Sequence, residues 1–164
     1  MDKLSKEILK DAFAAESDAA QQSTKHGQQS LADHWSPALL LERAAHLSQL
    51  AHHGDGSAGE TLKEFPRHCA ILSFRSRDGQ AEIHANFADV FYVLEGRTTL
   101  VTGGSVVDGA STGPGETRGS AVMGGARQEL RAGDVAHVPA GLPHQMLVAS
   151  GQTVTCLVMK VQEN

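Results

Sequence analysis

The sequence has few cysteines, no basic cluster and no long apolar run. Its two cysteines, Cys69 and Cys156, lie far apart in apolar stretches, so we interpret them as core residues rather than as a disulfide frame or zinc site. The formal net charge is -5 and Lys and Arg form no cluster, which argues against a nucleic-acid-binding protein. No apolar stretch approaches the roughly 18–20 residues that cross a bilayer.

The amino terminus is charged where a secretory signal would need its apolar segment. Residues 1–7 read Met-Asp-Lys-Leu-Ser-Lys-Glu. We therefore expect a cytoplasmic protein, unless a signal has been removed from in front of residue 1. The 164 residues, 40% hydrophobic and 20% charged, have the balance of one globular protein with room for a sizeable core.

The chain divides into a helical amino-terminal extension, residues 1–65, and a β-rich part, residues 66–164. A first helix is expected over about residues 5–21, which are rich in Ala, Lys and Glu. A second is expected to start after Ser36, which can cap it ahead of a proline, and to stop at Gly54. Apolar residues at helical spacing predict that this second helix packs against another part of the protein: Leu40, Ala44, Leu47 and Ala51.

Short β-like runs fill most of the remaining sequence. They are rich in Val, Ile, Leu, Thr and aromatic residues, and Gly, Pro or Asp bounds each of them. Many short strands without helices between them predict an antiparallel sandwich or barrel, and a barrel has an interior mouth where a small site can lie. The runs cover about residues 69–74, 81–86, 90–94, 97–102, 128–130, 134–138, 145–149 and 153–161.

The segment of residues 103–125 does not follow this pattern of short apolar runs. It holds eight of the chain's 17 glycines, and it also contains Pro114 and Glu116. So much glycine disfavours regular structure, so we expect a long loop. The loop could be a lid over the barrel mouth or an excursion without function, and Glu116 could reach the mouth as a general base.

A first group of chemically useful residues surrounds His84. Side chains two residues apart on a strand face the same way, so His84 with Asn86, or Glu82 with His84, could approach one ion. Asp89 is an odd number of residues from His84, so it reaches the same side only if the strand bends or bulges near Phe87 and Ala88. From Val90 on, the sequence predicts a buried strand.

A second group runs from Gly133 to His144. A strand begins after the turn at Gly133, and residues 139–141, Pro-Ala-Gly, form a second tight turn. Because His144 follows that turn closely, a stiff backbone would fix the direction of its imidazole, as a preorganised ligand requires.

These two groups resemble the paired motifs of the cupin superfamily. The second cupin motif is Gly, five residues, Pro-x-Gly, two residues and His. The residues that match it in full are Gly133, Pro139, Gly141 and His144. The first motif is His-x-His, three or four residues, Glu, six residues and Gly, and its second half is matched by Asp89 and Gly96, with Asp in place of Glu.

The His-x-His half of the first motif can be placed in two frames. With His84 as the first histidine, Asn86 takes the second place and the gap to Asp89 is one residue short. With His84 as the second, Glu82 takes the first place and the gap is regular. We prefer the first frame, because Gly79 then lies nearer to its expected distance upstream.

The resemblance implies an all-β protein, a single jelly-roll-like cupin barrel over roughly residues 67–161 with the helical extension in front of it. It also implies a divalent metal ion bound by His84, Asp89 and His144, with Asn86 as a fourth ligand. An amide oxygen is a weaker, harder donor than imidazole, so iron or manganese is favoured over zinc, or the site binds metal loosely; nickel is the other candidate. The alternative is a barrel that has lost its metal.

The first functional hypothesis is a metal-dependent enzyme acting on a small molecule, with a dioxygenase as first guess and an isomerase or lyase as other choices. Two imidazoles and one carboxylate leave positions open on iron for substrate and dioxygen. The alternative is a barrel that binds or senses a small ligand without catalysis. No catalytic residue is assigned. Cupins commonly pair through their sheets, so a homodimer is expected, with no nucleic-acid or membrane partner.

Overall fold

The computed structural model describes residues 32–163. The chain divides into two compact units, Met1–Trp35 and Ser36–Asn164, and the fold described here is that of the second. The helix predicted over residues 5–21 lies outside the described residues. Within the described part, no helix combines the length and apolar character needed to span a membrane.

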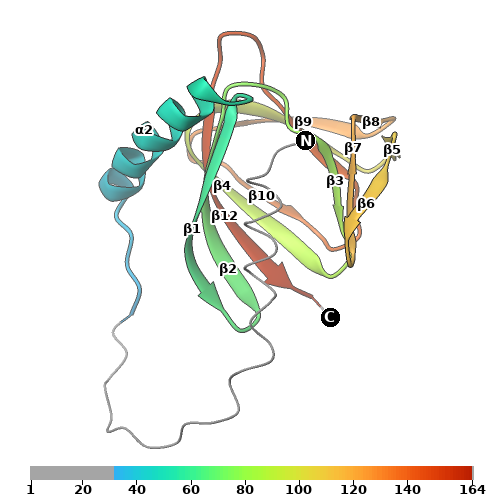
Figure 1. The fold of residues 1–164 in the computed structure, drawn as a ribbon, viewed down its shortest axis with the longest axis horizontal. Coiled ribbons are helices and arrows are strands. Elements are labelled where there is room, and N and C mark those ends of the chain that lie inside the picture. Colours follow the sequence, from blue (N-terminus) through green and yellow to red (C-terminus); the bar gives the residue numbers. More distant parts are fainter. Residues whose placement is uncertain (1–31, 164) are drawn as a thin grey trace, which may run out of the picture. The chain divides into compact units, whose positions relative to one another are not determined.

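The helix predicted after Ser36 is confirmed as α2, Pro37–His53. The Ser36 hydroxyl accepts a hydrogen bond from the Leu39 N–H at 3.2 Å, which satisfies one of the free amides of the first turn. The helix packs over β1 (Ser57–Phe65) and β2 (His68–Arg75), on the outside of the sheet (Figure 1). Its buried face is the predicted one: Leu40, Ala44, Leu47 and Ala51.

The rest of the unit is a curled antiparallel sheet, as predicted (Figure 1). The strand order is β1-β2-β12-β4-β11-β3-β7-β6, with β9 and β10 paired to β4, while β5 and β8 form a separate two-stranded sheet. The remaining strands are β3 (Ala81–His84), β4 (Phe87–Thr102), β5 (Ser105–Val107), β6 (Ala110–Gly113), β7 (Glu116–Gly119), β8 (Ala121–Met123), β9 (Ala126–Arg131), β10 (Val135–Val138), β11 (His144–Leu147) and β12 (Val154–Gln162).

Strand β4 connects the two halves of the barrel. Its first half pairs with β10 and β12, and its second half pairs with β9 and β11. The change of partners falls at Gly96, which has a φ of +79°. The inward side chains of both halves form one core: Phe91, Val93, Leu100, Leu130, Val138, Met146, Val148, Val154, Cys156 and Val158. Both cysteines are free. Cys156 lies in this core, as predicted, whereas Cys69, which was also predicted to be a core residue, is only half-buried and lies outside it.

Gly96 makes the closest backbone contact at the point where β4 changes partners. A Cβ there would lie 2.0 Å from the carbonyl oxygen of Thr153, and the residue also needs a positive φ. We expect Gly96→Ala to lower the free energy of unfolding by about 3 kcal/mol or more, measured by urea denaturation. Gly151 has a φ of +75° with nothing near its Cβ position, so Gly151→Ala should cost only about 1–2 kcal/mol. Equal losses in the two variants would show that the contact with Thr153 is unimportant.

The prediction of an irregular loop over residues 103–125 was wrong. The segment contains four short strands, β5 to β8, and most of its glycines lie in the turns before, between and after them. Gly115, with a φ of +73°, makes the turn between β6 and β7, and Gly119 lets β7 approach Val106, whose Cγ1 lies 2.2 Å from the position of a Cβ. Strand β7 pairs with β3, so this segment forms part of the barrel wall rather than a lid.

The β-structure begins before the boundary expected at residue 65. Residues Ser57–Phe65, assigned from the sequence to the extension, form β1 and pair with β2 along their length. Exposed charged side chains such as Glu64 suit an edge strand, because they discourage pairing with another sheet. The same charges weaken the apolar signal by which a strand is found in a sequence.

Candidate metal centre

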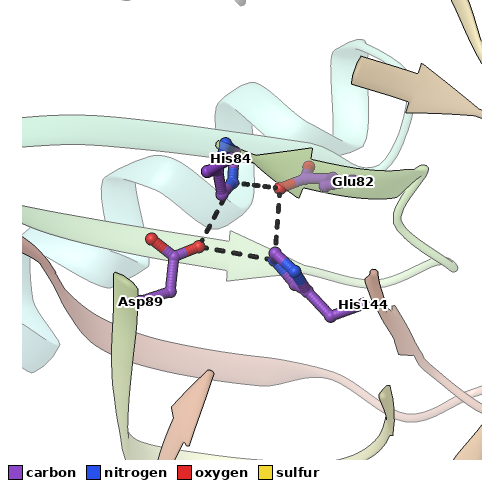
Figure 2. Close-up of side chains that lie close together, drawn as sticks. All are labelled: Glu82, His84, Asp89 and His144. Atoms are coloured by element: carbon purple, nitrogen blue, oxygen red, sulfur yellow. Dashed lines mark hydrogen bonds and ion pairs between the residues drawn. The ribbon is translucent and has the colours of Figure 1, made fainter. Parts of the chain in front are cut away.

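Four side chains from three neighbouring strands meet inside the barrel (Figure 2). Glu82 and His84 come from β3, Asp89 from β4 and His144 from the first position of β11. One ligand atom from each lies within 4.8 Å of all the others. The two histidines and Asp89 are buried, with 2–4% of their surface exposed, so this is an enclosed cluster rather than an acidic surface.

Backbone pairing explains why these residues meet. Glu82 and His84 are two apart on β3, so they face the same side, and His144 is directly opposite Glu82 in the β11–β3 ladder. The bend required to turn Asp89 toward His84 is present. It falls at Ala85 and Asn86, where β3 ends and before β4 begins.

Asn86 is not part of the cluster, contrary to the frame that the sequence analysis preferred. It lies in the turn, where it is exposed, and its backbone carbonyl accepts a hydrogen bond from the Glu163 N–H at 3.0 Å. Because β3 stops at His84, the alternation of side chains does not continue to Asn86. Glu82 supplies the fourth donor instead, so the structure has the arrangement of the second frame.

His144 presents an unpaired nitrogen to the centre. Its Nδ1 lies 3.2 Å from the carbonyl oxygen of Leu142, which can only accept, so Nδ1 donates to this carbonyl and Nε2 faces the centre. Nε2 is buried and has no hydrogen-bond partner among the described residues. It lies 3.4 Å from Asp89 Oδ2 and 3.7 Å from Glu82 Oε2. A buried polar nitrogen without a hydrogen-bond partner is costly, and coordination of a cation by Nε2 would remove that cost.

His84 presents its Nε2 to the same two carboxylates. The distances are 3.2 Å to Glu82 Oε2 and 3.3 Å to Asp89 Oδ2 (Figure 2). On the other side of the ring, Nδ1 lies 2.6 Å from Oε2 of Glu116, which is opposite His84 in the β3–β7 ladder. Glu116 therefore reaches the site, as the sequence suggested, but it orients an imidazole and is not free to act as a base.

The carboxylates determine the protonation of this cluster in the absence of a metal. Burial acts to lower the pKa of His84, but hydrogen bonds with three carboxylates, that of Asp89 first, outweigh it and raise the pKa to about 10. Burial acts to raise the pKa of Asp89 and of Glu82, yet their contacts with the histidines and with nearby positive charges hold both pKa values below the usual range. Both carboxylates are ionised at neutral pH.

Two cations complete the cluster, and sequence reasoning missed both. Arg118 in β7 forms an ion pair with Oε1 of Glu82, and Lys160 in β12 lies with its Nζ 2.9 Å from Oδ1 of Asp89. The one available signal was the position of Lys160 in an apolar run, on the same side as Val158. A lysine at an inward position of a strand is rarely buried without a partner.

The set of two imidazole nitrogens and two carboxylate oxygens fits a divalent metal ion. Each histidine has one nitrogen held by an oxygen atom outside the centre and the other turned inward, which is how metal-binding histidines are usually oriented. Three of the four residues predicted as ligands, His84, Asp89 and His144, lie together here, and Glu82 lies with them in place of Asn86.

Several solved structures are similar to this chain. TT1209 from Thermus thermophilus is 20% identical, with a TM-score of 0.50, over 71% of this chain and 93% of that chain. An uncharacterized conserved protein with a double-stranded β-helix domain from Klebsiella pneumoniae is 14% identical, with a TM-score of 0.49, over 66% of this chain and 78% of its own. The Cnp3 cupin domain of Schizosaccharomyces pombe is 12% identical, with a TM-score of 0.49, over 65% of each chain.

Identities this low establish the fold alone. No protein-family model matches the chain, and a search of curated proteins gives no significant match. The sheet topology, the paired motifs and the likeness to TT1209 agree. The chain has the cupin-type fold, a double-stranded β-helix barrel, as the sequence predicted.

Proposed function

We propose that the barrel binds one divalent metal ion through Glu82, His84, Asp89 and His144. The observation that carries the proposal is the buried Nε2 of His144, which faces two carboxylate oxygens and makes no hydrogen bond with the described residues. Imidazole with carboxylate suits iron, manganese, zinc or nickel, and two oxygen donors favour iron or manganese first. Metal analysis of protein purified without chelator tests this directly. Protein that is empty and cannot be reloaded with any of the four would refute it.

On this basis we propose a metal-dependent enzyme acting on a small molecule, with oxidation by dioxygen as the first reaction class to test. A bound metal ion would supply Lewis-acid chemistry or, if it is iron or manganese, redox chemistry. The protein's own part is to hold the donors. Glu116 fixes the ring of His84, the carbonyl of Leu142 fixes the ring of His144, and the barrel wall keeps bulk water from the buried cluster.

One observation favours a second function, the binding or sensing of a small ligand without catalysis. Every carboxylate at the centre is already held, Glu82 by Arg118, Asp89 by Lys160 and Glu116 by His84, so none of these three is free to act as a base. An oxygen-consumption screen of the metal-loaded protein distinguishes the two functions. Turnover that disappears in His144→Ala supports the enzyme, whereas ligand binding without turnover supports the sensor.

Metal affinity should rise with pH. The pKa of His84 is about 10 in the metal-free protein, so its Nε2 carries a proton at neutral pH, and this proton must leave before Nε2 can bind a cation. Glu82 and Asp89 have lowered pKa values and release none. We expect the association constant to increase about tenfold per pH unit between about pH 6 and about pH 8. Calorimetry in buffers of different ionisation enthalpy should count about one proton released, and a flat profile would contradict this.

The homodimer and the cytoplasmic location remain predictions from the sequence. A homodimer would elute from a size-exclusion column coupled to light scattering at twice the chain mass of 17.3 kDa.

A further inference from the structure

The two carboxylates of the candidate metal centre are held in the same way. Lys160 Nζ lies 2.9 Å from Oδ1 of Asp89, and the other oxygen, Oδ2, faces the two histidines. Arg118 forms an ion pair with Oε1 of Glu82, and the other oxygen, Oε2, faces the same histidines. In each carboxylate one oxygen is therefore engaged by a cation, and only one is directed to the centre.

Backbone pairing builds this arrangement into the barrel. Lys160 on β12 is the register partner of Asp89 on β4, and Arg118 on β7 is the register partner of Glu82 on β3. The side chains of Lys160 and Arg118 are 9% and 18% exposed. Since directly opposite residues have neighbouring Cβ atoms, the ladder itself places each cation beside its carboxylate. An ion pair with so little contact with water is also weakly screened by salt.

We propose that Lys160 and Arg118 restrict Asp89 and Glu82 to one ligand oxygen each, and so select transition-metal ions against Ca²⁺. This inference rests on the metal site proposed above. Calcium takes six to eight oxygen ligands and uses carboxylates that bind through both oxygens, whereas imidazole suits the transition metals. A centre with two nitrogens and only two available oxygens is poor for calcium and adequate for Mn²⁺.

The test compares the affinities of the full-length protein for Mn²⁺ and Ca²⁺, before and after each cation is removed. In Lys160→Met and Arg118→Met a freed carboxylate oxygen can turn to the metal. Loss of a positive charge strengthens the binding of both divalent ions by a similar factor, so it cancels in the ratio of the two affinities. The ratio therefore reports the number of oxygens offered. We expect the preference for Mn²⁺ over Ca²⁺ to fall about tenfold or more in each variant.

Two further variants serve as controls. Arg127 is exposed on β9, so Arg127→Met removes a positive charge elsewhere and should leave the preference unchanged. Arg118→Lys keeps a charge that can hold one oxygen of Glu82, and should retain most of the preference. If Lys160→Met does not fold, as judged by circular dichroism, the less buried Arg118→Met decides the question.

The outcomes separate this inference from the metal site itself. A wild-type protein that prefers Mn²⁺, together with a preference unchanged in both methionine variants, would overturn the role of the cations and leave the site standing. If the wild-type protein binds Ca²⁺ as tightly as Mn²⁺, the role of the cations is likewise overturned and the metal site still stands. A wild-type protein that binds neither of these ions, nor iron, zinc or nickel, would remove both the site and the inference.

Discussion

Replacing His144 by alanine should weaken metal binding more than about 100-fold while the barrel stays folded. Loss of a residue that merely orients a metal ligand typically costs 10–100-fold, so loss of a ligand should cost more. The side chain is 3% exposed and its Nε2 makes no hydrogen bond with the described residues, so the metal-free protein loses packing but no satisfied interaction of that nitrogen. Isothermal titration with Mn²⁺ or Zn²⁺ measures the effect, and circular dichroism verifies the fold.

His137 provides the matched control for this experiment. It comes from the same motif, seven residues earlier, but it lies in β10 with 53% of its side chain exposed, next to Glu163. His137→Ala should leave metal affinity within about a factor of two of the wild type, because neither residue belongs to the cluster. If the two alanine variants bind metal equally well, the ion is not held where we propose.

The second large effect is expected on stability, at the buried pair of Asp89 and Lys160. Removal of one partner leaves a buried charge uncompensated, so Asp89→Leu and Lys160→Met should each cost about 3–5 kcal/mol in the metal-free protein. In the double variant neither charge remains to be desolvated. We therefore expect its cost to be about 2–3 kcal/mol smaller than the sum of the two single costs, measured by urea denaturation with chelator present.

A surface pair in the same protein gives the comparison. Arg43 on α2 and Glu60 on β1 form an ion pair with side chains 38% and 35% exposed. The corresponding double-mutant cycle combines Arg43→Met and Glu60→Leu. Its coupling free energy of unfolding should be below about 1 kcal/mol, because water and salt screen an exposed pair. If the stability losses of Asp89→Leu and Lys160→Met simply add up in the double variant, the two charges contribute to stability independently of each other.

Features determined by local interactions could be predicted from the sequence. Helix α2 begins where Ser36 caps it and buries the four predicted residues, because capping and helical spacing depend on neighbours along the chain. His144 could be assigned for a similar reason. The Pro139–Gly141 turn is specified by its own residues, with Gly141 at a φ of +78°, and it delivers the imidazole to the barrel interior.

The first motif could not be resolved in the same way. Whether Asn86 or Glu82 joins His84 depends on where β3 ends. Strand β3 ends at His84, which pairs with β7, while Glu82 pairs with β11. Those partners come from segments more than 30 residues away along the chain. The glycine-rich segment was misjudged for a related reason. Its short strands are held by pairing with each other and with β3, while local propensity alone favours a loop.

The amino-acid sequence by itself determined the cupin-type barrel, the helix ahead of it and three of the four donors at its centre, since turns, caps and motif spacing are local. Only the tertiary structure decided the fourth donor, Glu82, and the partners of all four. Arg118 and Lys160 lie beside their carboxylates because of strand register, which is a relation between distant segments. Sheet pairing brings these charges together, and no pattern within a single strand records which charges will meet.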